Sequence, residues 1–487
     1  MDSREQPSLY RDTMWGQVDA ADTALLSELE SLLASRYISR LSKVKQLGLM
    51  SRIVPECDHS RLEHSVGAVH VVLKILRHLQ DQFVDPIPKD LLRDIVAAVL
   101  LHDATHYPFS HATERALIPS APLKFATHKH YLPALIQLIR KEEPDLLSEE
   151  SAQRIAWLLQ VGTHRNGECA TSSEAIESKY GLQPWHRQII ASAIDGDRLD
   201  YIPRDLRYSK LLALPTVDFT NISLQLVERL CVVPLETLKG GTCQVLALDY
   251  DGLPIAAHFL ILRFLLYAYG YFSPHLRGLE GAYILMLRLL NNIIPLRDDV
   301  PNEGSKPEEC ALRFVINHND ETFSAWLKQV YDKRVQKESN SNIRQFLEDT
   351  YSITVGIQAI GHVRPFSTCG SCRYADISPY FQHEIGDWSG WSKLIEYVNQ
   401  CLADHGKWWA VMPDVLNPEH DETKEFYVRG PDNQLSLLSQ HLSVVSRLFA
   451  QRVERLDFYV SPLADDDASI GEFVRSNIVA RLCRKGG

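Results

Sequence analysis

The sequence predicts a mostly α-helical protein with a smaller α+β region at its C-terminal end. Most of residues 20–295 repeats apolar side chains at spacings of three and four, which is typical of one face of an α-helix. Beyond Trp391 the pattern changes to short apolar runs typical of strands. We therefore predict a helical region over 1–296, a linker and helical extension over 297–389, and an α+β region over 390–487.

Six segments of the first region carry the helical pattern. Ala21–Ser35 has leucines on one face, and His64–Leu79 runs without proline and places valines on one face. Asp90–Leu101 follows Pro88, with Asp90 as its expected N-cap, and ends at His102 and Asp103. Three more helices are expected at His130–Arg140, Ser151–Leu159 and Pro184–Ala193.

The rest of the chain is expected to contain a loop, three strands and one helix. Arg297–Glu309 is acidic, holds proline, glycine and asparagine, and is typical of a surface loop or linker. The strands are expected at Trp408–Met412, Phe426–Val428 and Leu456–Val460, and the helix at Ser436–Val453.

The most apolar stretch is Ile255–Phe272, which contains His258 and Arg263. A membrane span needs about 18 or more apolar residues with few charges, so we expect a buried amphipathic helix and no membrane. The N-terminal segment is polar and acidic and has no signal-peptide pattern. Nine scattered cysteines indicate a reducing compartment, and we interpret Cys369 and Cys372 as a reduced pair in a loop. A cytoplasmic protein is expected.

Composition excludes two broad classes of protein. Hydrophobic residues make up 45% and charged residues 23% of the chain, values typical of a globular protein and not of a disordered one. With 51 Lys and Arg against 62 Asp and Glu, the net charge is −11. Proteins that coat nucleic acid usually carry the opposite sign. The charge still allows a small basic pocket for a phosphorylated small molecule.

Histidine and aspartate side chains lie at the ends of three predicted helices. His64 opens one helix, His102 and Asp103 close the next, and Asp197 follows the run PWHRQIIASAI. Two imidazoles with two carboxylates suit a hard or borderline divalent metal. The His–Asp dipeptide by itself is weak evidence, because a capping aspartate beside a buried histidine has the same sequence.

Four motifs around these residues decide between the two interpretations. They are RLSKVKQLG (Arg40–Gly48), RLEHS (Arg61–Ser65), HDATHYPFSH (His102–His111) and DGDRLDYIPRD (Asp195–Asp205). Together and in this order they resemble the HD-domain metal phosphohydrolases, and most of all the deoxynucleoside triphosphate (dNTP) triphosphohydrolases, which include the SAM-and-HD-domain proteins. The early DTMWG also resembles the family's opening strand. The resemblance covers residues 10–295 and implies that 1–296 is an HD-domain helical bundle, without a SAM domain.

The resemblance implies that His64, His102, Asp103 and Asp197 bind a divalent metal ion, which could be Mg, Mn, Fe or Zn. Such a metal polarises the phosphate and binds the attacking water.

The resemblance also implies residues for proton transfer. His106 would lie near the α-phosphate and His128 at the scissile bond, with Glu114 orienting His128. A histidine paired with a carboxylate can serve as acid or base. We interpret His70 and His111 as structural histidines.

Eight residues match family positions that contact the substrate. Arg61, Arg198 and Arg263 match triphosphate contacts, which suits the planar fork of arginine. Tyr201 and Asp205 match contacts to the sugar, where a buried ring leaves no room for a 2′-hydroxyl. Gln46, Leu47 and Tyr271 match residues that line the sugar and base pocket. Other interpretations stay open: Arg263 could extend to the helix surface, and Asp205 could pair with Arg204 or Arg207.

Several positions depart from the family pattern. Ala104 and Thr105 replace the usual Leu-Gly, and Glu114 replaces an aspartate. Lys129, Tyr267 and Phe272 also differ from the residues at the matching family positions. The metal set is complete, so these departures bear on sugar and base preference.

Three hypotheses follow. The first is a metal-dependent hydrolase that cleaves a dNTP into deoxynucleoside and triphosphate. The second keeps the metal site but acts on another nucleotide or a nucleic-acid end, and the third is a nucleotide sensor with weak turnover. The resemblance further implies a homo-oligomer and an activator nucleotide as candidate partners, whereas long nucleic acid is disfavoured by the net charge.

Overall fold

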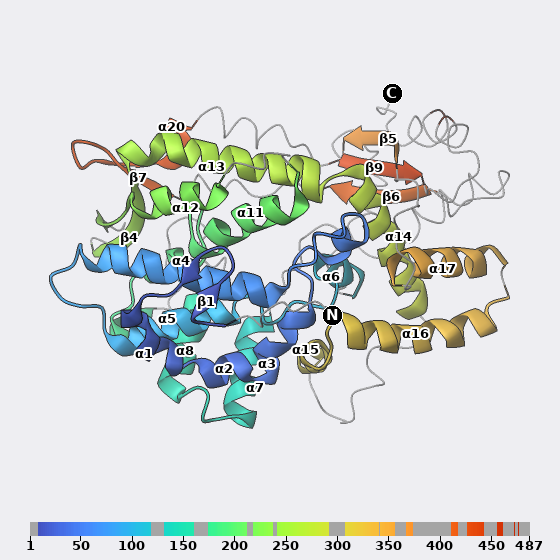
Figure 1. The fold of residues 1–487 in the computed structure, drawn as a ribbon, viewed down its shortest axis with the longest axis horizontal. Helices are drawn as coiled ribbons and strands as arrows, with labels where there is room; N and C mark the ends of the chain where they lie inside the picture. Colours follow the sequence, from blue (N-terminus) through green and yellow to red (C-terminus); the bar gives the residue numbers. More distant parts are fainter. Residues whose placement is uncertain are drawn as a thin grey trace.

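The computed structural model has an elongated shape built mainly of helices (Figure 1). The predicted fold class, mostly α with a smaller region that contains strands, is confirmed. The structure describes residues 8–117, 131–159, 174–211, 218–236, 241–291, 307–339, 341–355, 367–373, 411–416, 426–442 and 455–460, with Glu472 and Ser476.

The chain begins with a two-stranded hairpin and a series of short helices. Strands β1 (Arg11–Asp12) and β2 (Gly16–Gln17) pair antiparallel. The single helix expected over Ala21–Ser35 is instead broken. The short elements here are η1 (Ala20–Asp22), α1 (Thr23–Ser27), α2 (Glu30–Ala34), α3 (Arg36–Ser39), η2 (Arg40–Lys43) and η3 (Gly48–Arg52).

Helix α4 (Arg61–Gln80) is the long central helix of the bundle. It begins three residues before the predicted start, because Ser60 and Glu63 form a capping box that satisfies its first N–H groups. Helix α5 (Lys89–Leu101) begins one residue before Asp90, so the N-cap position is Pro88 and not the predicted Asp90. The other bundle helices are α6 (His111–Leu117), α7 (Leu132–Glu142), α8 (Glu149–Leu159), α9 (Glu174–Tyr180), α10 (Pro184–Gln188), α11 (Gly196–Ser209) and α12 (Phe219–Val227).

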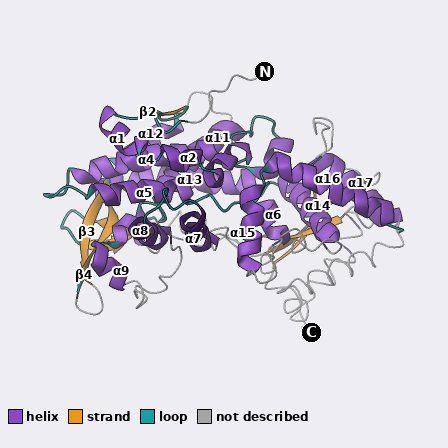
Figure 2. Cartoon of the chain, turned by 90° about the horizontal axis from the view of Figure 1, so that it is seen from below, coloured by secondary structure: helices purple, strands orange, loops and turns teal. Residues whose placement is uncertain are grey.

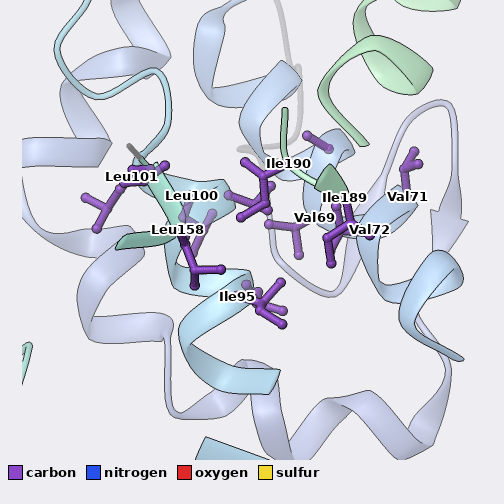
Figure 3. Packing of buried hydrophobic residues seen from close by; sticks show 14 of the residues in the cluster. Val69, Val71, Val72, Ile95, Leu100, Leu101, Leu158, Ile189 and Ile190 are labelled. Carbon is purple, nitrogen blue, oxygen red and sulfur yellow. The ribbon is translucent and has the colours of Figure 1, made fainter. Parts of the chain in front are cut away.

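The first of two large hydrophobic clusters, called the first core here, joins α4, α5, α8 and α10. Val69 and Val72 of α4 face Ile95 of α5, and Leu158 of α8 and Ile189 pack beside them (Figure 3). All five side chains are buried. Burying a side chain of this size stabilises a fold by about 1.5–3 kcal/mol, so this cluster fixes the relative positions of the four helices.

The second core lies at the other end of the molecule (Figures 1 and 2). It joins η3 and α6 to four helices of the C-terminal half, and includes Phe109, Tyr283 and Phe323. Those helices are α14 (Pro274–Asn291), α15 (Pro307–Asn317), α16 (Asp320–Lys337) and α17 (Ser341–Thr354). The predicted loop Arg297–Glu309 therefore ends in a helix from Pro307 onward, and residues 297–306 lie outside the described ones.

Two further sheets use strands from distant parts of the chain. Strands β3 (Leu230–Glu236) and β4 (Thr242–Asp249) form a hairpin, and β7 (Tyr427–Arg429) adds parallel to β4, followed by β8 (Leu435–Leu437). The other sheet has the order β5 (Ser367–Arg373), β9 (Arg455–Val460) and β6 (Val411–Leu416), all antiparallel. The first sheet thus joins the predicted region 1–296 to the predicted region 390–487.

The three predicted strands of the C-terminal part have counterparts in β6, β7 and β9. Helix Ser436–Val453 was predicted, but Leu435–Leu437 is the strand β8, and α20 (Leu438–His441) is a single short helix. Cys369 and Cys372 lie in strand β5 and not in the predicted loop, because this segment pairs with β9. Residues 443–454 lie outside the described ones.

The apolar segment predicted as a buried helix forms η5 (Tyr250–Gly252), α13 (Leu253–Leu265) and the π-helix η6 (Leu266–Tyr271). Among the described residues, this one stretch is long and apolar enough to cross a membrane, although 33% of its most apolar window is buried. Phe259 and Arg263 are buried while Tyr269 is 65% exposed, so one face alone is covered.

Helices α4 and α11 approach most closely at Gly67. A Cβ atom at this position would overlap the side chains of Arg204 and Asp200, which are themselves fully buried and ion-paired. We expect Gly67→Ala to lower the free energy of unfolding by about 1–3 kcal/mol in chemical denaturation, although alanine normally favours a helix by about 1 kcal/mol. In the matched control Gly270→Ala, the nearest atom is Leu266 Cδ1 at 3.5 Å, an ordinary contact. Equal stability of both variants would contradict this packing.

Candidate active site

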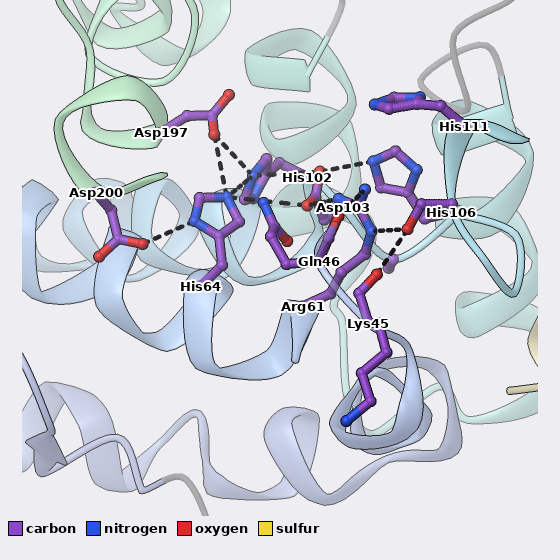
Figure 4. A network of polar contacts seen from close by, with 12 residues as sticks. Lys45, Gln46, Arg61, His64, His102, Asp103, His106, His111, Asp197 and Asp200 are labelled. Atoms are coloured by element: carbon purple, nitrogen blue, oxygen red, sulfur yellow. Dashed lines mark hydrogen bonds and ion pairs between the residues drawn. The ribbon is translucent and has the colours of Figure 1, made fainter. Parts of the chain in front are cut away.

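Three helices bring the four predicted metal ligands to one point (Figure 4). His64 lies in the first turn of α4, His102 and Asp103 follow the last turn of α5, and Asp197 lies in the first turn of α11. The two histidines and Asp103 are buried. Because α4, α5 and α11 are fixed by packing, His64 and Asp197 are held by helices, while His102 and Asp103 lie directly after the end of one.

The distances between these ligand atoms fit a single metal ion. His64 Nε2 lies 3.2 Å from His102 Nε2 and 3.1 Å from Asp197 Oδ1. His102 Nε2 lies 3.4 Å from Asp103 Oδ1. Two neighbouring ligand atoms that each lie about 2.0–2.2 Å from one ion are about 2.8–3.1 Å apart in octahedral geometry and about 3.3–3.6 Å apart in tetrahedral geometry. The ligand atoms of His64, His102 and Asp103 all lie within 4.8 Å of one another, and these three side chains could hold a metal ion. Asp197 is not part of this group, although its Oδ1 lies 3.1 and 3.6 Å from the two histidine nitrogens.

Each histidine ligand is oriented through its outer nitrogen. His64 Nδ1 donates to Asp200 Oδ2 at 2.8 Å, and His102 Nδ1 donates to the carbonyl of Val99 at 2.6 Å. These two bonds leave both Nε2 atoms free of protons when the rings are neutral, and both atoms point to the same place. This is the arrangement by which metal-binding histidines are usually fixed.

Asp200 was not singled out from the sequence, although it lies in the quoted run DGDRLDYIPRD. Its carboxylate bonds to His64, to Trp15 Nε1 at 2.5 Å, and to Arg204 at 2.8 and 2.9 Å. Arg204 also donates to Asp12 Oδ2 at 3.0 Å. The signal was present: Asp200 lies one helical turn after Asp197 and four residues before Arg204, a spacing that faces the same side of a helix.

Electrostatics in this cluster favours charged carboxylates and a positive ligand. Burial opposes ionisation of Asp197, but hydrogen bonds with His102 and His64 outweigh it and hold the pKa of Asp197 well below its usual range. Burial likewise opposes ionisation of Asp103, and nearby His102 outweighs it, so its pKa is also well below the usual range. Burial disfavours the charge on His64, yet hydrogen bonds with Asp197 and Asp200 raise its pKa to about 10.

Arg61 lies beside the predicted metal ligands and connects them to residues 44–50, which contain the predicted substrate contacts Gln46 and Leu47 and are called the substrate loop here. Its guanidinium donates to Asp103 Oδ2 at 2.6 Å, to Ser110 Oγ at 2.9 Å and to the carbonyl of Gln46 at 3.3 Å. A guanidinium so close to the ligand cluster can contact a phosphate bound there. The side-chain oxygen of Gln46 is buried, and no described residue bonds to it.

His106 follows the metal ligands and lies 3.3 Å from Asp103 Oδ1. Its Nδ1 bonds to Glu114 Oε1 at 2.6 Å, and the other oxygen of Glu114 bonds to His111 Nδ1 at 2.9 Å. Both oxygens of Glu114 thus have partners other than the predicted His128, which lies outside the described residues. His111 was interpreted as structural, yet it is half-exposed and its ring meets that of His106 at 4.9 Å.

The pKa shifts of His106 and Glu114 indicate which of the two side chains is charged at neutral pH. Burial raises the energy of a charged imidazole, and together with the neighbouring Arg61 it lowers the pKa of His106. Burial opposes ionisation of Glu114, but His106 and His111 outweigh it, and its pKa lies well below the usual range. At neutral pH the structure therefore pairs a neutral His106 with a charged Glu114.

The residues predicted to contact the sugar also lie together. The ring of Tyr201 meets His64 edge-on at 6.3 Å. Asp205 accepts hydrogen bonds from Tyr271 Oη and from His59 Nε2, the latter at 2.8 Å. Its alternative partner Arg204 pairs with Asp200 and Asp12 instead. His59 was missed in the sequence, where nothing distinguishes it from an ordinary core histidine.

The remaining predicted contacts are placed less directly. Arg198 pairs with Asp195 across the first turn of α11. Arg263 is 2% exposed, so it does not extend to the helix surface, and its guanidinium lies 5.6 Å from the ring of Tyr267. Leu47 packs against the second core. His70, interpreted as structural, is buried and bonds to the carbonyl of Leu9 at 3.0 Å.

Comparison with known proteins supports an HD-domain family. No protein-family model matches the chain. An uncharacterized protein of Mycoplasma genitalium is 26% identical over 266 residues, which are 54% of this chain and 55% of that protein. A putative HD domain-containing protein of Acanthamoeba polyphaga mimivirus is 24% identical over 42% of this chain and 44% of that protein. The Dictyostelium discoideum homolog of the deoxynucleoside triphosphate triphosphohydrolase SAMHD1 is 26% identical over 42% of this chain and 37% of that protein.

A solved structure with a similar fold is a phosphohydrolase from Bacteroides thetaiotaomicron. The TM-score is 0.62 at 18% identity, over 93% of this chain and 98% of that chain. At this identity the likeness concerns the fold. The chain spans about half the length of the curated relatives it matches, 55% and 52% for two of them. Together these proteins support an HD-domain phosphohydrolase.

Asp200 should control metal affinity through His64. We expect Asp200→Asn to weaken metal binding about 10- to 100-fold, because His64 Nδ1 loses its charged acceptor. The measurement is a titration of the metal-free protein with Mn²⁺ or Zn²⁺. Asp94→Asn is the matched control, since Asp94 is an equally buried carboxylate of α5, eight residues before His102, that bonds to Arg154 at 2.5 Å. If both variants bind metal as the wild type does, Asp200 does not orient the ligand.

Metal affinity should rise with pH. The pKa of His64 is raised to about 10 in the metal-free protein, so at neutral pH a metal must displace its proton. We expect affinity to increase up to about tenfold per pH unit between pH 6.5 and 8.5. Calorimetric titrations in buffers of different ionisation enthalpy would measure the released proton. Affinity that is independent of pH would show that His64 is already neutral.

Proposed function

We propose that this protein is a metal-dependent phosphohydrolase that cleaves dNTPs to deoxynucleoside and triphosphate. The observation that carries the proposal is the pair of outer-nitrogen hydrogen bonds that aims His64 and His102 at the carboxylates of Asp103 and Asp197. Buried rings held in this way make a preorganised site, and the relatives support a phosphohydrolase. When bound, a divalent metal there would polarise the phosphate and activate water.

His106 is the candidate base on this chain. Its Nδ1 proton is held toward Glu114, so Nε2 is an unprotonated acceptor at neutral pH. This atom faces Asp103, so it lies within reach of a water or phosphate next to the metal ligands. Holding the ring in one tautomer keeps the acceptor ready without any rearrangement. His128 remains a predicted second acid or base.

Arg61 is the candidate group for the phosphates. It is buried and bonded to Asp103, so its position is set by the same residue that binds the metal. A fixed guanidinium orients a phosphate and stabilises charge that develops on it. Arg198 and Arg263 are proposed to contact the more distant phosphates.

Tyr201 and Asp205 support a deoxyribose in preference to a ribose. Tyr201 lies against His64, so a sugar near the metal must pass its ring. Asp205 is buried and held from both sides by His59 and Tyr271. A fixed acceptor beside a fixed ring can bond a 3′-hydroxyl while excluding a 2′-hydroxyl, and such a site discriminates strongly between substrates.

The proposal predicts triphosphate as a product. Each dNTP and each NTP is incubated with the purified protein and Mg²⁺, Mn²⁺, Fe²⁺ or Zn²⁺, and the products are separated by anion exchange. We expect triphosphate and deoxynucleoside from dNTPs and little reaction with NTPs. His102→Ala should lower the rate at least about 100-fold, because it removes a metal ligand. His70→Gln, a change at a buried histidine of α4 outside the site, should leave the rate within about twofold.

Other outcomes point elsewhere. Release of phosphate or diphosphate without triphosphate would overturn the cleavage position. Equal rates for NTPs and dNTPs would refute the role of Tyr201.

A further inference from the structure

The first turn of α16 bonds to two loops of the candidate site. The side chain of Asp320 is buried, and its two oxygens accept from the backbone N–H of Phe109 at 2.8 Å and of Lys45 at 2.9 Å. Phe109 belongs to the loop 102–110, which begins with the predicted ligands His102 and Asp103 and contains His106. Lys45 directly precedes Gln46 and Leu47. A single carboxylate from the C-terminal half of the chain therefore connects both loops.

These bonds are not needed to begin the helix. Asn319 is the N-cap of α16, and its side chain accepts from the N–H groups of Glu321 and Thr322. The exposed N–H groups at the start of α16 therefore already have the acceptor that an N-cap side chain usually provides. Asp320 instead points away from its own helix, toward the two loops.

Arg40 makes a second connection at the same place. Its guanidinium donates to the carbonyls of Ala104 and His106 at 2.6 and 2.8 Å, and to the carbonyl of His318 at 3.2 Å. The backbone of 104–106 is therefore held to the residues just before α16. Arg40 is buried, so these bonds replace those it would make with water.

The two loops need such support because their backbones are unusual. Phe109 and Ser110 have φ of 55° and 54°, which side chains other than glycine rarely adopt. Gly48 has φ of 50°, and a Cβ atom there would lie 2.7 Å from the carbonyl oxygen of Phe109. Conformations of this kind cost about 1–3 kcal/mol each and persist when the surroundings enforce them.

The loops also cross between the two cores. Ala104 is buried in the first core, whereas Tyr107 and Phe109 are buried in the second. The ring of Phe109 meets that of Phe323, one turn into α16, at 6.2 Å. Because Phe109 packs against Phe323, the position of α16 helps to set the position of the C-terminal end of the loop 102–110.

Asp320 is surrounded by cations. Arg40 of η2, Lys45, Arg52 of η3 and Arg61 of α4 all interact with its charge, and Tyr283 of α14 is also near. Burial nevertheless dominates, outweighs the bonds from Lys45 and Phe109, and raises the pKa of Asp320 to about 6. Its charge is present at neutral pH and is lost as the pH falls below about 6.

We propose that Asp320 is a positioning residue of the active site, which holds the loop of the metal ligands and the substrate loop in one arrangement. The role rests on the proposed function, because it is exerted on Gln46, Leu47 and His106. It makes turnover depend on the placement of α16, a helix outside the predicted catalytic region.

Asp320→Asn tests the role with little change in shape. Asparagine keeps one acceptor but presents an N–H group to the other loop and removes the charge. We expect kcat to fall about tenfold or more at pH 8, because small misplacement of reacting groups is costly, with bound metal unchanged. The ratio of wild-type to variant kcat should approach 1 at pH 5, where Asp320 is neutral in the wild type too. Glu321→Gln is the matched control: its carboxylate is exposed, bonds to Lys43, and should not affect kcat.

Hydrogen exchange provides a readout that needs no substrate. Amides of residues 44–50 and 103–111 should exchange faster in Asp320→Asn than in Glu321→Gln at pH 7. Thermal melting curves first establish that both variants are folded. A kcat ratio that is the same at pH 5 and pH 8, or unchanged exchange in both loops, would overturn the positioning role. If the wild type hydrolyses no nucleotide, the proposed function fails, and the exchange measurement still decides whether Asp320 holds the loops.

Discussion

The site depends on the hydrogen bonds that the buried carboxylate of Asp200 accepts. It receives hydrogen bonds from His64 of α4, Trp15 beside the N-terminal hairpin and Arg204 one turn along α11. A buried carboxylate is costly unless such donors surround it. The three partners can meet only if the two helices touch, and they do so because Gly67 has no side chain. The packing of α4 against α11, the position of the N-terminal hairpin and the orientation of His64 therefore all depend on the same buried carboxylate.

The site lies where the two hydrophobic cores meet. The metal ligands belong to helices of the first core, whereas the loop after His106 and the substrate loop lead into the second. Arg61 spans the boundary, since it bonds to Asp103 on one side and to Ser110 and Gln46 on the other. Arg61 therefore connects the ligand cluster to the segment that contains Gln46.

Charge is distributed very differently inside the site and over the whole chain. The protein carries a net charge of −11, yet Arg40, Lys45, Arg52 and Arg61 all lie around the single buried carboxylate of Asp320. Arg40 and Arg61 are buried, and buried cations need compensating charge. A phosphate bound at the metal would add negative charge next to Arg61, which suits a small anionic substrate and not a long polyanion.

The sequence by itself determined the helical class, most helix positions and which histidine and aspartate side chains converge at one point, because helical periodicity and short motifs are local properties. It did not reveal the break within Ala21–Ser35, the strand at Leu435–Leu437 or the joining of β4 to β7, which depend on pairing between distant segments. Only the tertiary structure assigned Glu114 to His106, His59 to Asp205 and Asp320 to the site loops. A buried hydrogen-bonding group must find its partner in space, and no spacing along the chain encodes that choice.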